Sequence, residues 1–181
     1  KLSNIIFDGD EEELKNTTNT QPALMAVSIA LIKILESELN KKVTDFVDVV
    51  LGHSLGEYSS LCCAESIDLE STAKILRIRG EAMQNAVNGI KTRMIAVIGL
   101  DIDIIEQEIE KLNKNDNQIC EIANDNCPGQ VILSGTENGV NIIGDKLKLA
   151  GARSIIDLNV SAPFHCSLMK PASLIMSEAL N

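Results

Sequence analysis

The sequence predicts an α/β protein built from two parts, and two observations support this prediction. First, an apolar run at residues 46–51 leads through a Gly-x-Ser-x-Gly turn into a helical pattern, the strand–turn–helix order of a parallel α/β layer. Second, residues 91–160 show the order β-α-β-β-α-β, which is the split βαβ or ferredoxin-like pattern. We therefore expect a larger domain from residues 1–90 and 161–181, with a smaller domain of residues 91–160 inserted into it.

The composition argues against several classes of function. The 181 residues are 45% apolar and carry a net charge of −10, which argues against nucleic acids and anionic membrane surfaces as partners. No apolar run is long enough to span a membrane. The five cysteines form an odd set without a metal-type CxxC pair, so we expect free, mostly buried thiols in a reducing compartment. We expect no metal site and no cofactor. We also expect a monomer.

The first long helix is predicted to follow a polar stretch. Residues 1–7 have the pattern of a helix end, and residues 8–19 are polar and acidic, as in a loop. Thr20 and Pro22 are typical of a helix start, so a helix is expected to run from there to about Leu39. Its apolar residues follow helical spacing and nearly encircle its first half, which predicts a buried helix; they include Leu24, Val27, Leu31, Ile34 and Leu35.

The apolar run and the turn after it have the arrangement of a nucleophile elbow. Gly52 and Gly56 lack a Cβ, so the strand and the helix after it can pass closely while Ser54 takes a strained conformation at the apex. The N–H of Leu55, directly after Ser54, is then a candidate oxyanion donor. A structural strand-to-helix turn without chemistry is the alternative.

The remaining elements follow from the periodicity of the apolar residues. A helix is predicted over residues 69–87, carrying Arg77 and Arg79 and ended by Asn88-Gly89. A last helix is predicted over residues 166–180, in which Pro171 either disturbs the helix or begins its regular part. The smaller domain is predicted to contain, in order, a strand at 94–98, a helix at 102–112, a turn at 113–117, strands at 119–123 and 130–134 around Pro128-Gly129, a helix at 137–149 and a strand at 154–160.

A serine hydroxyl needs a nearby base to act as a nucleophile at neutral pH. The chain has two histidines, His53 beside Ser54 and the distant His165, so His165 is the candidate base. Asp157 is the nearest acidic residue that could complete a triad, although nothing else marks it out. Cys166 adjoins His165, but neighbours in sequence do not face each other on a helix, which argues against a Cys–His pair. A histidine merely packed at a helix start is the alternative.

Five stretches of the chain resemble the malonyl-CoA:acyl carrier protein transacylases and the related acyltransferase domains of fatty-acid and polyketide synthesis. The most specific is Gly-His-Ser-Leu-Gly-Glu-Tyr at residues 52–58. The others are Gln-Pro-Ala-Leu at 21–24, Arg-Gly at 79–80 with Met-Gln at 83–84, Asn-x-Asn-x-Pro-Gly-Gln-Val at 124–131, and Ser-x-Pro-x-His at 161–165 with Met-Lys-Pro-Ala at 169–172. Together they extend over nearly the whole chain in the family's order.

The resemblance implies a fold, a reaction and roles for particular residues. The fold would be an α/β-hydrolase-like core carrying a ferredoxin-like insert. The reaction would transfer a malonyl group from malonyl-CoA to the phosphopantetheine thiol of acyl carrier protein through a Ser54 acyl-enzyme, in type II fatty acid synthesis. The resemblance implies a Ser54–His165 dyad without a carboxylate, Arg79 as the ligand of the malonyl carboxylate, and further pocket residues at His53, Asn124 and Asn126. An ordinary turn before Pro128 is the alternative reading of the two asparagines.

The chain also departs from the family's pattern. An N-terminal Gly-Gln-Gly-x-Gln stretch and a C-terminal glutamine are missing, so we expect a fragment that lacks both ends. Lys91-Thr92-Arg93 stands where the family has small residues. A serine hydrolase or thioesterase on the same elbow and a non-catalytic module that binds the carrier protein are the alternatives. The expected location is the cytoplasm in a bacterium, and a plastid or mitochondrion in a eukaryote.

Overall fold

The computed structural model describes residues 1–112 and 118–181, and these form two compact units. The first unit contains Lys1–Ala82 and Ile175–Asn181, and the second contains Met83–Leu174. The turn expected at residues 113–117 lies outside the described residues. The domain boundaries expected near residues 90 and 160 stay a prediction. No helix in the described ranges is both long enough and apolar enough to cross a membrane.

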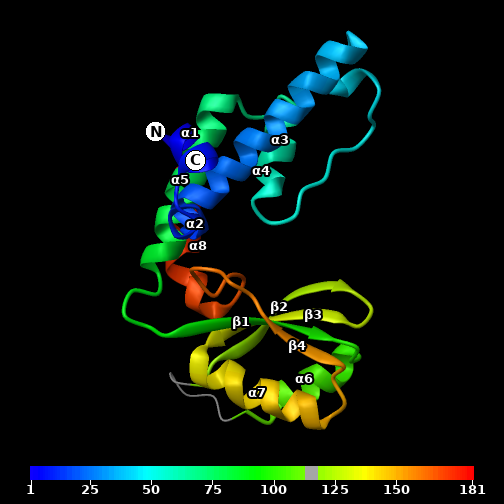
Figure 1. Ribbon diagram of the computed structural model, residues 1–181, viewed down its shortest axis with the longest axis vertical. Coiled ribbons are helices and arrows are strands. Elements are labelled where there is room, and N and C mark those ends of the chain that lie inside the picture. Colours follow the sequence, from blue (N-terminus) through cyan, green and yellow to red (C-terminus); the bar gives the residue numbers. More distant parts are fainter. Residues whose placement is uncertain (113–117) are drawn as a thin grey trace. The chain divides into compact units, whose positions relative to one another are not determined.

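The first unit is helical (Figure 1). Its helices are α1 (Leu2–Asp8), α2 (Glu11–Lys15), α3 (Thr17–Leu39), the 3₁₀ turn η1 (Val43–Asp45), α4 (Gly56–Cys63) and α5 (Leu69–Asn85), of which α5 continues into the second unit. After the 3₁₀ turn η2 (Ser167–Met169), α8 (Lys170–Ala179) runs from the second unit back into the first. The helical pattern at residues 1–7 is confirmed as α1. Pro171 lies in the first turn of α8, so of the two alternatives it begins the regular part of the last helix. The α-helix itself starts at Lys170 and not at residue 166, because η2 precedes it.

The loop predicted at residues 8–19 is wrong, because side-chain caps start two helices there. Asp10 accepts a hydrogen bond from the N–H of Glu12 at 3.1 Å and starts α2. Asn16 accepts one from the N–H of Thr18 at 3.1 Å and starts α3 before the expected position. Short polar side chains that suit a loop are also the side chains that cap helices.

Pro22 therefore lies inside α3 and not in its first turn. Proline has no N–H, so the carbonyl of Thr18, four residues earlier, receives no intrahelical bond from it. Arg77 of α5 lies there instead, with its Nη1 3.4 Å from the Thr18 oxygen.

The prediction that α3 is buried through its apolar stripe is also wrong. Leu24, Val27, Leu31, Ile34 and Leu35 are all exposed in this chain. The buried apolar side chains of α3 lie elsewhere on the helix: Met25 and Ile29 form a core with Leu76 of α5, and Leu55 and Tyr58 pack against it. Periodicity identifies an apolar face, but it does not identify which segment covers that face.

The apolar run at residues 46–51 does not form the predicted strand. In the described part of the chain, the strands all lie between Thr92 and Asp157. The segment between η1 and α4 is irregular (Figure 1), and Leu51 is 89% exposed. A strand needs a hydrogen-bonded neighbour, so an apolar run without one cannot be a strand.

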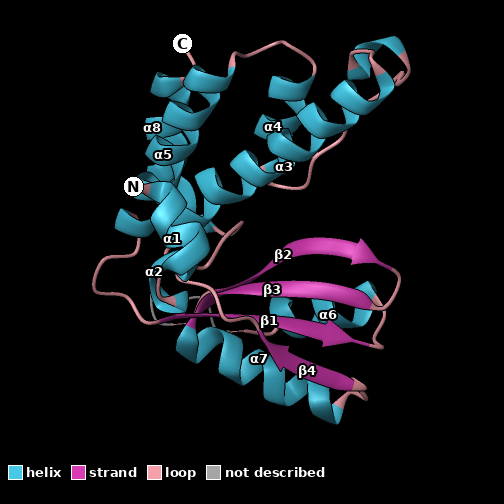
Figure 2. Cartoon of the chain, turned by 45° about the horizontal axis from the view of Figure 1, so that its top comes forward, coloured by secondary structure: helices cyan, strands magenta, loops and turns pink. Residues whose placement is uncertain are grey.

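The second unit has the predicted β-α-β-β-α-β order. Its elements are β1 (Thr92–Ile98), α6 (Ile102–Glu110), β2 (Cys120–Cys127), β3 (Gln130–Thr136), α7 (Glu137–Leu149) and β4 (Ser154–Asp157). The four strands form one sheet in the order β2-β3-β1-β4, with every neighbouring pair antiparallel (Figure 2). This is the ferredoxin-like arrangement, and with the helical unit it confirms the α/β fold class.

Alternation along β1 divides the second unit into two packed faces. Ile95 and Val97 point toward α6 and α7, whose Ile105 and Ile143 complete the main core. Met94 and Ala96 point to the opposite face, where Ile132 and Phe164 pack on them. The segment before His165 therefore rests on the face of the sheet that carries no helix of the β-α-β-β-α-β unit.

Candidate active site

Ser54 lies at the apex of the turn between the irregular segment and α4, in the strained conformation that the elbow predicts. Its φ is 55°, in the left-handed region that residues other than glycine rarely adopt. A Cβ on Gly52 would fall 1.9 Å from the carbonyl carbon and oxygen of Gly56, so the close approach expected at Gly52 is confirmed. A Cβ on Gly56 would meet nothing within 4 Å. The same steric reason does not hold for Gly56 in this chain.

The backbone around Ser54 is ordered by the first turn of α4. The N–H groups of Gly56 and Glu57 donate to the carbonyls of His53 and Ser54, at 2.9 and 3.2 Å. The N–H of Leu55 has no hydrogen-bond partner among the residues that the structure describes. That N–H is adjacent to the Ser54 hydroxyl, so it remains available to an oxyanion formed there.

Arg79 of α5 is the cation of the site and is only 9% exposed. Its Nη2 donates to the Oγ of Ser54 at 3.0 Å, and its Nη1 donates to the Oε1 of Gln21 at 2.6 Å. Its Cζ lies 5.7 Å from the centre of the Tyr58 ring. Within the described ranges, no carboxylate forms an ion pair with this guanidinium.

The electrostatics of Arg79 reflect this burial. Burial lowers the pKa of the guanidinium from its usual value, and the Tyr58 phenol and the Glu57 carboxylate act in the opposite direction. An arginine remains protonated even so. The site therefore presents a desolvated positive charge beside the candidate nucleophile.

Gly80 explains how α5 comes close enough to α3 to place Arg79. A Cβ on Gly80 would lie 2.7 Å from the Thr17 oxygen and from the Thr18 Cα. Only a residue without a side chain allows this approach between the two helices. The glycine that follows Arg79 is therefore required for the packing of α5 against α3.

Gln21 and Tyr58 are contacts of Arg79 to which sequence reasoning gave no role of their own. Gln21 is buried and donates from Nε2 to the Oγ1 of Thr17 at 2.9 Å. The signal available in the sequence was the polar pair Thr17 and Gln21. The two residues lie four positions apart, and therefore face each other, on a helix that also carries a buried apolar face.

His165 lies in the second unit, in a segment held on both sides. Its φ is 58°, so it also occupies the left-handed region. Before it, the N–H of Phe164 lies 3.2 Å from the Sδ of Met94. After it, the Sγ of Cys166 donates to the carbonyl of Pro163 at 3.1 Å, and the N–H of Ser167 donates to Glu121 at 2.6 Å.

The other predicted pocket residues are spread over both units. His53 is exposed beside Ser54. Asn124 and Asn126 lie on β2 of the second unit, which runs on to Cys127 and not only to Ala123 as predicted. Two register shifts interrupt the pairing of β2 with β3: Asn124 borders one, and Asn126 lies within the other, opposite no residue of β3. Pro128-Gly129 forms the tight turn after them, with φ of 77° at Gly129.

The structure disfavours catalytic roles for Asp157 and Cys166. The carboxylate of Asp157 pairs with Arg93, with Nε and Oδ1 2.6 Å apart. Burial raises the pKa of the Cys166 thiol, which disfavours the thiolate that a nucleophile requires. Among the described side chains, no three of the His, Cys, Asp and Glu type gather closely enough to hold a metal ion.

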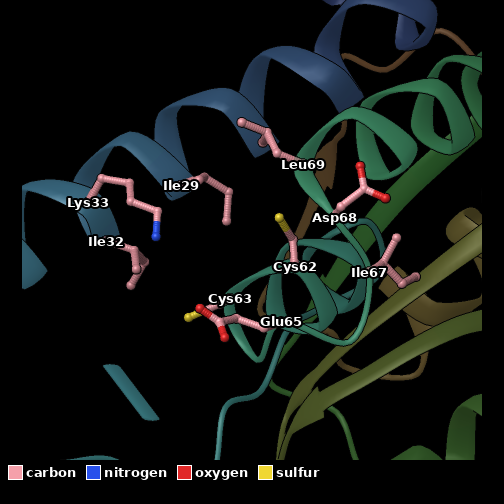
Figure 3. A pocket seen from close by; sticks show the side chains of 9 residues that line it. All are labelled: Ile29, Ile32, Lys33, Cys62, Cys63, Glu65, Ile67, Asp68 and Leu69. Carbon is pink, nitrogen blue, oxygen red and sulfur yellow. The ribbon is translucent and has the colours of Figure 1, made fainter. Parts of the chain in front are cut away.

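The first unit also has a cavity of about 270 Å³ that includes none of the predicted site residues. Figure 3 shows its lining side chains, which come from α3, from the end of α4 and from the residues around the start of α5: Ile29, Ile32, Lys33, Cys62, Cys63, Glu65, Ile67, Asp68 and Leu69. Lys33 pairs with Glu36 at 2.7 Å, and Glu65 pairs with Lys42. Burial raises the pKa of the Cys63 thiol. The cavity thus offers neither an unpaired lysine nor an activated Cys63.

Comparison with known proteins gives one consistent result. The model of the acyl transferase domain family matches residues 1–181. The malonyl CoA-acyl carrier protein transacylase of Bacillus subtilis is 42% identical over 181 residues, which are 100% of this chain and 55% of that protein. The protein of the same name from Staphylococcus aureus is 42% identical over 176 residues, or 97% of this chain and 54% of that protein. The chain thus spans about half the length of the curated relatives it matches.

Solved structures agree with this result. The acyl-carrier-protein-S-malonyltransferase of Bartonella henselae has a TM-score of 0.91 and 47% identity, covering 99% of this chain and 56% of that one. A malonyl-transacylase in complex with its type II polyketide synthase acyl-carrier protein has a TM-score of 0.90 and 39% identity, covering 99% of this chain and 56% of that one. Because the family model and these relatives match the chain over nearly its whole length, the chain belongs to the acyl transferase domain family.

Proposed function

We propose that the chain carries the acyl-accepting and malonyl-binding part of a malonyl-CoA:acyl carrier protein transacylase. The observation that carries this proposal is the buried Arg79 guanidinium, which has no carboxylate partner among the described residues and donates to the Ser54 hydroxyl at 3.0 Å. One methylene separates the thioester carbonyl of a malonyl group from its carboxylate. A nucleophile and a carboxylate-binding cation for this substrate must therefore be close neighbours.

The proposed reaction has two half-reactions that mirror each other. Ser54 gives its hydroxyl proton to His165, its Oγ–C bond forms at the malonyl carbonyl, and the C–S bond to CoA breaks. The CoA sulfur takes the proton from His165. The phosphopantetheine thiol of acyl carrier protein then gives its proton to His165 and attacks the ester, and Ser54 recovers its hydroxyl.

Further roles in the proposal belong to the elbow and to the second unit. The N–H of Leu55 would donate to the oxyanion of each tetrahedral intermediate. His53, Asn124 and Asn126 would line the pocket for the acyl group or its carrier. The resemblance in sequence supports these assignments, together with the location of His53 and Leu55 beside Ser54.

The proposal also covers the wider setting of the chain. The relative solved with its acyl-carrier protein supports a carrier protein as the partner of this chain. The domains would be residues 1–90 with 161–181 and residues 91–160, and the protein would act as a monomer without a cofactor. The bacterial relatives support a cytoplasmic location.

A chimera gives a direct test, because the chain spans 55% of the Bacillus subtilis relative. In this chimera, residues 1–181 replace the matching segment, so that the relative supplies the rest. Malonyl-CoA should yield an ester on Ser54 that is transferred to the thiol of a holo carrier protein. Release of free malonate without transfer would indicate a hydrolase or thioesterase. A folded chimera that takes up no malonyl group would indicate a binding module.

A further inference from the structure

Two buried polar side chains of α3, Gln21 and Thr17, form a chain of hydrogen bonds that ends at Arg79. Gln21 is 2% exposed and Thr17 is 3% exposed. The Nε2 of Gln21 donates to the Oγ1 of Thr17 at 2.9 Å, and its Oε1 accepts from the Nη1 of Arg79 at 2.6 Å. Both contacts join groups that are shielded from water, where a misplaced polar atom is costly.

The chemistry of arginine settles how the Gln21 amide must be oriented. A guanidinium only donates hydrogen bonds, so the end of the amide that faces Arg79 has to be the oxygen. The Nε2 of Gln21 then needs an acceptor, and the hydroxyl of Thr17 supplies it. Thr17 therefore selects the orientation of Gln21 in which the amide oxygen holds Nη1.

The neutrality of Gln21 matters as much as its geometry. A carboxylate at this position would pair with the buried guanidinium and neutralise it. The amide oxygen binds one side of the guanidinium but leaves its net charge in place. The other side, with Nη2, faces Ser54.

We propose that Gln21, oriented by Thr17, is a positioning residue that holds Arg79 toward Ser54 and keeps its charge available for the carboxylate of the acyl substrate. This inference rests on the proposed function, because it concerns how the malonyl carboxylate is recognised. It predicts that selectivity for a carboxylated acyl group depends on an uncharged acceptor at position 21.

The decisive variant is Gln21→Glu, which changes almost no volume and replaces the amide by a carboxylate. In the chimera with the Bacillus subtilis relative, the ratio of kcat/KM for malonyl-CoA to that for acetyl-CoA should fall by on the order of 10²-fold. The loss should lie mainly in KM for malonyl-CoA, because the internal carboxylate competes with the substrate. Gln107→Glu, at an exposed position of α6, is the matched control and should leave the ratio unchanged.

A second pair of variants tests Thr17. Thr17→Val keeps the shape of the side chain but removes the acceptor, whereas Thr17→Ser keeps it. In the 181-residue chain labelled with ¹⁵N-arginine, the Nη–H signals of Arg79 should be resolved in the wild type and in Thr17→Ser. They should broaden in Thr17→Val and in Gln21→Met. A residue with a merely structural role would change the melting temperature without changing these signals.

The outcomes separate this inference from the proposed function. If Ser54 accepts malonyl and Arg79→Ala abolishes selectivity, but Gln21→Glu keeps the wild-type ratio within about threefold, the positioning role is wrong and the function stands. If Gln21→Glu does not fold, the Arg79 signals in the Thr17 pair decide, and identical spectra in Val and Ser variants overturn the inference. If no malonyl ester forms on the wild-type chimera, the function itself fails.

Discussion

The guanidinium of Arg79 and the hydroxyl of Ser54 are hydrogen-bonded, with Nη2 and Oγ 3.0 Å apart. The two residues are 25 positions apart in the chain and meet because α4 and α5 pack on the same core with α3. The bond places a buried cation directly beside the candidate nucleophile. Both the reactivity of Ser54 toward malonyl-CoA and the selection of that substrate are expected to depend on this pair.

Replacing Arg79 by alanine should remove the preference for malonyl over acetyl groups. An acetyl group leaves the buried guanidinium of the wild type without an anion, so selection against acetyl-CoA should be on the order of 10²–10³. In Arg79→Ala the ratio of kcat/KM for malonyl-CoA to that for acetyl-CoA should fall toward one. Arg79→Lys is the control that keeps the charge but loses the planar fork, and it should retain part of the selectivity. An unchanged ratio in both variants would contradict the role of Arg79.

Gly80→Ala should disturb the site through the backbone of α3. The added Cβ would lie 2.7 Å from the Thr17 oxygen, so α5 must move away, at a cost of about 1–3 kcal/mol in unfolding free energy. Denaturant unfolding of the chain measures this loss. Gly144→Ala is the matched control, because its Cβ would meet only the Ile95 Cδ1 at 3.4 Å in a helix interior. That substitution should cost less than Gly80→Ala, because only the end of one side chain has to move. Equal effects at both positions would rule out the close approach at Gly80.

His165→Ala should slow both half-reactions by a similar factor, because one base serves both directions. General acid–base catalysis contributes about 10²–10⁴-fold, and a loss within that range is expected. Single-turnover rates of Ser54 acylation by malonyl-CoA and of transfer to the holo carrier protein measure it. Asp157→Asn is the control, because Asp157 pairs with Arg93, and it should leave both rates unchanged. A larger loss of rate in Asp157→Asn than in His165→Ala would indicate that Asp157, and not His165, is the important residue.

The cysteines should differ strongly in their reaction with iodoacetamide. Burial raises the pKa of the Cys120 thiol to about 12, so at pH 8 very little of it is thiolate, and that fraction increases as the pH rises. Burial also raises the pKa of Cys166. Cys127 is exposed and should be modified first in the native chain. Mass spectrometry of timed samples shows the order, and modification of Cys120 as fast as Cys127 would contradict the buried core of the second unit.

The second unit was the more predictable part of the fold. Its strands alternate, as Met94 and Ala96 do against Ile95 and Val97, and both faces are covered by residues of the same unit. Because the partners are local, the pattern of the sequence determined the elements. Only the ends differed, as at β2, where Asn124 and Asn126 lie in a strand interrupted by register shifts.

The first unit was less predictable, because the pattern of its apolar residues does not show which segment packs on them. The run at residues 46–51 was predicted as a strand, but a strand needs a neighbouring strand. The apolar stripe of α3 that includes Leu31 was predicted to be buried, but it is exposed. The start of α3 was missed because Pro22 suggested a first turn, whereas Asn16 caps the helix.

Within the candidate site, the elbow at Ser54 was predictable because its glycine spacing is local. The contacts of Arg79 with other helices were not predictable. Gln21 contacts Arg79 across 58 positions of sequence, and no periodicity links two such positions.

The central claim is that Ser54 accepts a malonyl group and passes it to a carrier thiol. The most direct measurement is intact-protein and peptide mass spectrometry of the chimera after brief exposure to malonyl-CoA, followed by addition of holo acyl carrier protein. One malonyl group should appear on the peptide that contains Ser54, disappear when the carrier is added and reappear on the carrier. Ser54→Ala should show none of these species while keeping the fold. A folded wild-type chimera that carries no malonyl group, or carries it on another residue, would contradict the account.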